Sequence, residues 1–179
     1  QDSTLPPALP EEVQPVTGGV YTEGLVGQFS RLNPLLDLYN PSDHDINRLI
    51  FSSLIHFDDR GLPVGDLAES WGISLDGTVY NFSLQPEAIW HDGQPLTSND
   101  LLFTIDMMRD DQSIIPDDIR ELWKAVEVVI LDEKTIQFRP PEPFAPFMDY
   151  LTFGILPEHL LANLTHAEMV ESPFNIQPI

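Results

Sequence analysis

The chain has 179 residues, of which 42% are hydrophobic and 9% aromatic, and this is enough to bury a hydrophobic core. It carries 29 acidic and 8 basic residues, a formal net charge of −21, and the basic residues are scattered singly, which argues against a nucleic-acid partner. The sequence holds no cysteine, so disulfides, thiolate catalysis and cysteine-ligated zinc are excluded.

The first 18 residues are rich in Pro and Glu and offer little apolar surface to bury. This composition predicts a flexible leader over residues 1–18. The stretch lacks the basic and apolar regions of a signal peptide, and no apolar run in the chain approaches the roughly 20 residues of a spanning helix. We therefore expect the folded part to begin at residue 19.

The next segment predicts a strand and then a helix. GVYTEGLVG (19–27) alternates weakly between apolar and polar residues, as a strand does. In PSDHDINRLIFSSLIHF (41–57), Ser42 and Asp45 form a capping-box pattern, so a helix should begin near Asp43. The residues at helical spacing, which we expect to face a core, are Ile46, Leu49, Ile50, Ser53 and Leu54.

Two hairpins are predicted from turn signals between alternating runs. LDGT (75–78) places an Asp-Gly turn between two strands, and Tyr80, Phe82 and Leu84 give the second of them one buried face. VEVVILDEKTIQFRP (126–140) has the same pattern around DEK. The other predicted elements are a helix from Thr97 to about Arg109, a short helix from Pro116, a strand over 151–156 and a helix from Pro157.

The stretch WHDGQPLTSND (90–100) has a functional and a structural interpretation. His91 and Asp92 could serve as a general base or a metal-ligand pair in a hydrolase. Against this, Asp92-Gly93 is a turn pair, and Thr97 with Asp100 forms a capping box that starts a helix. The structural interpretation is favoured, and the hydrolase remains the alternative.

Other catalytic signatures are missing from the sequence. No two histidines have the i, i+4 spacing that would place two metal ligands on one helix face, so no metal site is predicted. There is also no Gly-rich phosphate loop, no G-x-S-x-G elbow and no S-x-x-K motif. We expect no cofactor and no catalytic residues.

Several phrases, in order, resemble a known family. They are LNPLL, LAESW, DGTVYNFSL, WHDGQPLTSND and ILPEHLL, followed by SPFNIQPI at the end. In this order and spacing the chain, from residue 19 on, is similar to the N-terminal part of the extracytoplasmic solute-binding proteins of oligopeptide and dipeptide ABC transporters, solute-binding protein family 5.

The resemblance implies a mixed α/β fold of the type II periplasmic-binding-protein class, with ligand held between two lobes. It implies that this chain is an N-terminal fragment: residues 19–179 form part of lobe one, with an outer subdomain of hairpins and helices at about 45–150, and the second lobe is absent. In the family, WHDGQPLTSND belongs to a corner of this outer subdomain.

The implied function is that of the binding component of an ABC importer, which captures peptides outside the cytoplasm and delivers them to the permease subunits. Family members also carry nickel complexes or oligosaccharides, so these ligands stay open. The protein would be extracytoplasmic, and its contact with the membrane would be a lipid anchor on an upstream cysteine that is not present here.

Ligand contacts in the family come partly from the segment that matches QFSRLNP. The candidate ligand-binding residues are therefore Phe29, Ser30, Arg31, Leu32 and Asn33. A guanidinium in a cleft can bind a ligand carboxylate through two hydrogen bonds, which makes Arg31 the main candidate. The alternatives are that the segment is a plain loop before Pro34 and that Arg31 is an ordinary surface arginine. Two readings from other classes remain: a hydrolase that uses His91 and Asp92, and an interaction domain without a small-molecule cleft.

Overall fold

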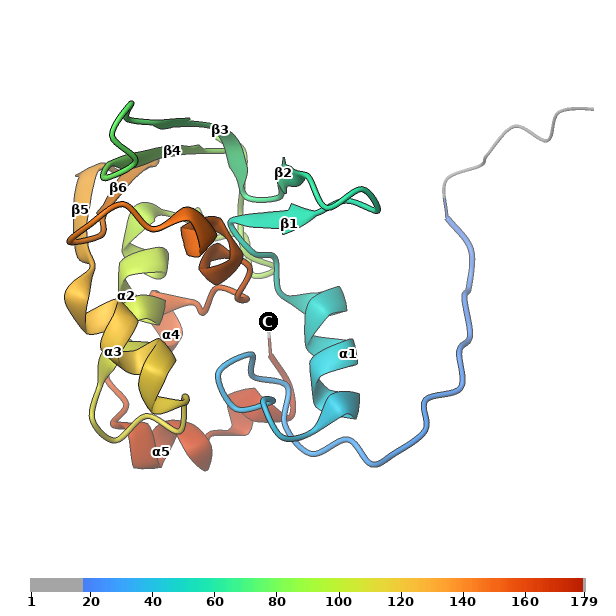
Figure 1. Cartoon of the computed structure of the whole chain (residues 1–179). Coiled ribbons are helices and arrows are strands. Elements are labelled where there is room, and N and C mark those ends of the chain that lie inside the picture. The colour runs from blue at the N-terminus through green and yellow to red at the C-terminus, as the bar shows by residue number, and fades with distance from the viewer. Residues whose placement is uncertain (1–17, 179) are drawn as a thin grey trace, which may run out of the picture.

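A computed structural model describes residues 18–178, and the predicted leader lies outside the described residues except for Gly18. Figure 1 shows α2 and α3 stacked against one side of an antiparallel sheet, with α1 standing apart from them. The elements in chain order are α1 (Pro41–Ile50), β1 (Ile55–Phe57), β2 (Pro63–Gly65), β3 (Ala68–Ile73), β4 (Tyr80–Leu84), α2 (Ser98–Arg109), α3 (Asp117–Ala125), β5 (Glu127–Asp132), β6 (Thr135–Arg139), the 3₁₀ helix η1 (Ala145–Leu151), α4 (Glu158–Leu161), α5 (His166–Val170) and the 3₁₀ helix η2 (Pro173–Asn175).

The main sheet has four antiparallel strands in the order β3-β4-β6-β5. Both predicted hairpins are confirmed: β3 pairs with β4, β5 pairs with β6, and the two hairpins join where β4 pairs with β6. The predicted buried face of β4 is confirmed too, because Tyr80, Phe82 and Leu84 are buried. A second, two-stranded sheet of β1 and β2 was not predicted from the sequence.

The core lies between this sheet and the helices that cover it. Phe82 and Phe138, from the two central strands, meet with their ring centroids 5.8 Å apart. Trp123 of α3 and Phe147 of η1 each bring a ring about as close to Phe138, at 6.1 and 5.9 Å. All four side chains are fully buried, so aromatic packing of this kind fixes α3 and η1 on the sheet.

Helix α1 differs from its prediction. It begins at Pro41, with Asn40 as the N-cap, rather than near Asp43 with Ser42 as the cap, and it ends at Ile50. Its buried residues are polar (Ser42, Asp43 and Asn47), and Leu49 is 87% exposed. The expected apolar stripe is therefore wrong at Leu49, because the polar side chains find hydrogen-bond partners inside the fold and take the buried face of the helix. It is confirmed at Ile50, which packs against the core, and at Leu54, which is buried beyond the end of the helix.

Two predicted strands do not form. Residues 19–27 are irregular and exposed, because a strand needs a neighbour to pair with and none of the residues 18–178 pairs with this segment. In 151–156 only an isolated bridge between Gly154 and Ser53 is present. The predicted helices after Thr97, Pro116 and Pro157 are confirmed as α2, α3 and α4. Within the described part of the chain, none of the helices has the length and apolar character that a membrane crossing requires.

Candidate functional site

The segment 28–33, which holds the predicted ligand-binding residues, lies against the first turn of α1. The amide of Ser30 donates to Oδ1 of Asp43 at 2.7 Å, and its hydroxyl donates to Oδ2 at 2.6 Å. The amide of Arg31 donates to the same Oδ2 at 3.0 Å. One carboxylate therefore binds the backbone of two consecutive residues.

Asp43 is well suited to accept these bonds. It is 1% exposed and lies in the first turn of α1, where the helix dipole favours negative charge. Burial by itself raises the pKa of the Asp43 carboxyl, but the hydrogen bonds from Ser30 and Arg31 outweigh burial, and the net pKa lies below its usual value. The carboxylate is therefore charged at neutral pH.

The other end of the segment is held by η2, near the end of the chain. The amide of Leu32 donates to the carbonyl of Asn175 at 2.6 Å, and the side-chain amide of Asn33 donates to Oδ1 of Asn175 at 3.1 Å. Asn175 in turn donates to the carbonyls of Met169 and Val170. Asn33 is 0% exposed, so it acts within the fold in this state.

The five predicted residues thus fall into two groups. The side chains of Ser30 and Asn33 form their hydrogen bonds with other residues of the fold. Phe29 is 46% exposed, and Arg31 and Leu32 are half-buried. Phe29, Arg31 and Leu32 are therefore the members whose side chains are at least partly accessible, and Arg31 is the one that carries a charge. The role of all five in ligand binding stays a prediction.

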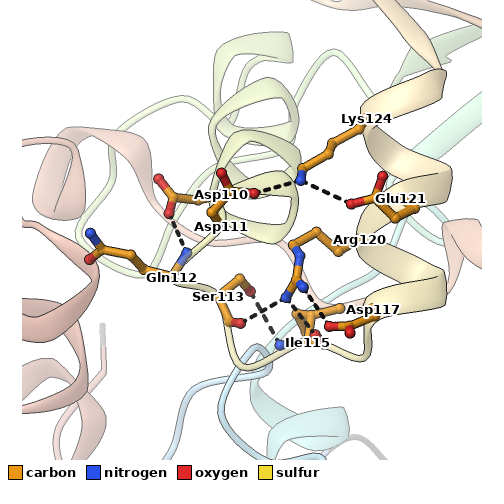
Figure 2. Close-up of polar contacts among 9 residues, drawn as sticks. All are labelled: Asp110, Asp111, Gln112, Ser113, Ile115, Asp117, Arg120, Glu121 and Lys124. Carbon is orange, nitrogen blue, oxygen red and sulfur yellow. Dashed lines mark hydrogen bonds and ion pairs between the residues drawn. The ribbon is translucent and has the colours of Figure 1, made fainter.

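The basic residues differ in whether their charged groups have partners. Six of the eight donate to carboxylates or carbonyls: Arg60, Arg109, Arg120, Lys124, Lys134 and Arg139. Figure 2 shows the partners of two of them: Lys124 binds Asp111 and Glu121, and Arg120 binds Asp117 and the carbonyls of Ser113 and Ile115. Among residues 18–178, the guanidinium groups of Arg31 and Arg48 have no such partner.

An open hollow of 830 Å³ begins directly after this segment. Its walls come from Pro34 and Leu35, from the exposed side of α1, from β1, from α3 and from the stretch 149–154. The lining is mostly apolar, and Arg48, Asp37, Asp66 and Asp149 supply its permanent charges. Sequence analysis missed this hollow because its walls are far apart in the chain. The exposed apolar residues of α1 were the available signal.

The stretch WHDGQPLTSND forms the predicted corner. The amide of Gln94 donates to Asp92 at 3.0 Å, Gly93 adopts a positive φ of 87°, and Thr97 with Asp100 completes the capping box of α2. The second oxygen of Asp92 lies 2.8 Å from Nε2 of His159, and the Gln94 amide and then His159 hold the pKa of Asp92 below its usual value. Asp92 thus pairs with His159, 67 residues away, rather than with His91, which is exposed.

The described residues contain no group of three or more His, Asp or Glu side chains arranged to hold a metal ion. A smaller cavity of 150 Å³ lies between the α2–α3 loop and α5, with His166 and Met169 among its lining residues. The residues that line this cavity do not form a set suited to acid–base or nucleophilic chemistry. Segment 28–33 presents one partly exposed aromatic side chain, Phe29, and one half-buried arginine, Arg31, on a backbone that hydrogen bonds hold at both ends.

Comparison with known proteins bears on the family and the fold, and the residues matched by the family profile do not include segment 28–33. Residues 63–171 match the profile of the bacterial extracellular solute-binding proteins, family 5 (middle region). A Brucella ovis protein, provisionally named an ABC transporter peptide-binding protein, is 38% identical over 124 residues, which are 68% of this chain and 23% of that protein. The chain thus spans about a quarter of the length of this relative.

Two solved structures show a similar fold. NikZ from Campylobacter jejuni, in complex with Ni(L-His), is 33% identical with a TM-score of 0.70, over 85% of this chain and 29% of NikZ. AppA from Bacillus subtilis, in complex with a nonapeptide, is 23% identical with a TM-score of 0.74, over 86% and 30% of the two chains. The predicted fold class is confirmed, and the chain belongs to the family 5 bacterial extracellular solute-binding proteins.

Proposed function

We propose that the protein is the substrate-binding component of an ABC importer, and that it captures peptides outside the cytoplasm and delivers them to the permease subunits. Family membership supports this proposal, as does the 38% identity with a relative that is provisionally named a peptide-binding protein. On this proposal the ligand lies between two lobes, and this chain forms part of the first, with an outer subdomain at about 45–150. Closure of two lobes about a hinge buries a ligand and separates loaded from empty protein.

The single observation that carries a ligand role for segment 28–33 is that the guanidinium of Arg31 has no carboxylate or carbonyl partner among residues 18–178, while hydrogen bonds hold its backbone at both ends. A peptide with a free terminus offers a carboxylate, which a guanidinium binds in a bidentate fork. Phe29 adds an exposed aromatic face for apolar contact. We propose these two side chains as the ligand contacts of this segment.

The test is a thermal-shift screen of the full-length protein against peptide pools, oligosaccharides and nickel with L-histidine, with the Arg31→Ala variant run in parallel. A ligand that binds the folded state raises the Tm. We expect peptides to raise it, and we expect the same peptides to bind the variant about tenfold more weakly, the effect of losing a charge-assisted pair. A screen in which no peptide shifts the Tm contradicts the proposal.

A nickel complex is the second candidate ligand, because NikZ, solved with Ni(L-His), is 33% identical to this chain. L-histidine also carries a carboxylate, so Arg31 could serve it in the same way. A Tm shift with nickel and L-histidine together, and none with peptides, would support this candidate. Nickel alone is the control, since it separates recognition of the complex from binding of the bare ion.

We further propose that the protein is held at the membrane by a lipid on a cysteine upstream of these residues. The support is the resemblance to family members with such an anchor. Growth of the source cells with a labelled fatty acid, followed by isolation of the protein, tests this. Label in the full-length protein is expected, and an unlabelled protein in the soluble extracytoplasmic fraction contradicts the anchor while leaving the transport function in place.

A further inference from the structure

Residues 26–31 follow the first turn of α1 closely, although they form no regular structure. The hydroxyl of Ser42 donates to the carbonyl of Val26 at 3.3 Å, and the side-chain amide of Asn40 donates to the carbonyl of Gln28 at 3.0 Å. Between them Gly27 has a φ of 140°, and a Cβ at this position would lie 2.1 Å from Oγ of Ser42. The segment is thus seated on the helix over its whole length.

Asp43 forms more hydrogen bonds to this segment than any other residue of α1. It accepts three hydrogen bonds from Ser30 and Arg31, and it is buried beneath them. These bonds fix the amides of Ser30 and Arg31, directly before the Cα that carries the Arg31 side chain. Asp43 itself is covered by the segment, so a ligand that contacts Arg31 does not touch it.

We propose that Asp43 is a positioning residue for ligand binding, which acts through Arg31 by holding the Ser30–Arg31 backbone in its binding geometry. This inference rests on the proposed function of segment 28–33. An irregular segment that is already ordered loses less conformational freedom when ligand arrives, so binding is tighter. Asparagine cannot replace the carboxylate, because its amide nitrogen is a donor and would face the N–H groups of Ser30 or Arg31.

The experiment compares Asp43→Asn with Asp45→Asn in the full-length protein. Asp45 is an exposed residue of the same helix, so its variant makes the same change of charge without touching the segment. The probes are tri-alanine, which has a free terminal carboxylate, and tri-alanine amide, which has none. Titration calorimetry measures the Kd of each at a temperature well below the Tm of every variant.

We expect Asp43→Asn to weaken tri-alanine binding by about tenfold and Asp45→Asn by less than about twofold. In an Arg31→Ala background, or with tri-alanine amide, Asp43→Asn should change the Kd by less than about twofold, because a residue that acts through Arg31 has no effect once that partner is removed. If Asp43 acted only in folding, Asp43→Asn would lower the Tm, but its effect on the Kd would not depend on Arg31 or on the terminal carboxylate of the probe. If Asp43→Asn does not fold, Ser30→Ala removes one of the three bonds and should weaken tri-alanine by a smaller factor.

The outcomes separate this inference from the function beneath it. A wild-type protein that binds tri-alanine and an Asp43→Asn variant with the same Kd overturn the positioning role alone. The same is true if Asp43→Asn weakens binding equally in the wild-type and Arg31→Ala backgrounds. A wild-type protein that binds neither probe nor any peptide pool overturns the proposed peptide function and this inference together.

Discussion

Asp100 shows how much one side chain contributes to this fold. It is 3% exposed, one carboxylate oxygen accepts from the amide of Thr97 at 2.8 Å, and the other accepts from the amide of Glu158 at 2.9 Å. One turn along α2, the hydroxyl of Thr104 accepts from the amide of Leu156 at 2.9 Å. The capping box was predicted from the sequence, whereas the bonds to α4 and the chain before it join residues more than 50 positions apart.

Asp100→Ala should destabilise the protein strongly. It leaves the amides of Thr97 and Glu158 without an acceptor, and buried unpaired donors of this kind cost roughly 2–3 kcal/mol of the free energy of unfolding. Urea unfolding followed by circular dichroism measures the loss. Asn99→Ala, at the exposed neighbouring position, is the control, and a loss no larger than that of the control would contradict the role given to Asp100.

At the scale of elements, the β5–β6 turn is tied to the corner that precedes α2. The ammonium of Lys134 donates to the carbonyls of Gln85, Ala88 and Leu96, at 3.2, 3.3 and 2.8 Å. The amide of Ser98 donates to the carbonyl of Glu133 at 2.8 Å. The corner 85–98 therefore owes its position to a hairpin that lies some 40 residues later in the sequence.

Lys134→Met should loosen this corner. Methionine keeps the apolar stem of the side chain but cannot donate, so the Leu96 carbonyl loses its partner, while the carbonyls of Gln85 and Ala88 keep only the backbone amides of Ala88 and Leu96. The expected cost is roughly 1–3 kcal/mol in the free energy of unfolding. Faster amide hydrogen exchange confined to residues 85–97 is the expected local sign. Lys124→Met is the matched control, since that lysine binds only carboxylates at the surface, and an equal effect on residues 85–97 in both variants would count against the tie.

At the scale of the whole molecule, the net charge of −21 makes its acids the dominant charges. Several carboxyl groups spread over the surface have pKa values below their ordinary values, because each accepts a hydrogen bond that favours the charged form. They are Asp58 (from the Leu62 amide), Asp76 (Ser74 hydroxyl), Asp92 (Gln94 amide), Asp111 (Lys124 ammonium) and Glu168 (Thr165 amide).

These pKa shifts predict how the stability of the protein falls at acidic pH. A carboxyl whose pKa is lower in the folded state stabilises the protein above its unfolded pKa, near 4, and this stabilisation is lost as the pH falls through the folded pKa. The Tm should therefore fall between about pH 5 and pH 2. Asp76→Asn should flatten that fall relative to Asp59→Asn, a change at an exposed aspartate in a different turn, and parallel curves for the two variants would show that Asp76 contributes nothing to it.

Much of the fold could be predicted from the sequence, because it depends on signals between neighbouring residues. The Asp-Gly turn, the alternation of Tyr80, Phe82 and Leu84, and the capping box of Thr97 and Asp100 are all short-range patterns, and each one appears in the structure as expected. The order and spacing of the longer phrases likewise indicated the family that the comparisons then showed.

What the tertiary structure decided was which partner each polar or apolar group finds. The apolar residues of α1 predicted a buried stripe, but Asp43 binds Ser30 and Arg31, Asn47 binds Asp37, and these bonds turn the polar face inward. Arg31 was a candidate from the resemblance, and only the structure showed that, among residues 18–178, its guanidinium and that of Arg48 lack the carboxylate or carbonyl partners that the other six basic residues have. A sequence states which groups can pair, and only the folded chain, through the distances it sets between remote residues, decides which pairs form.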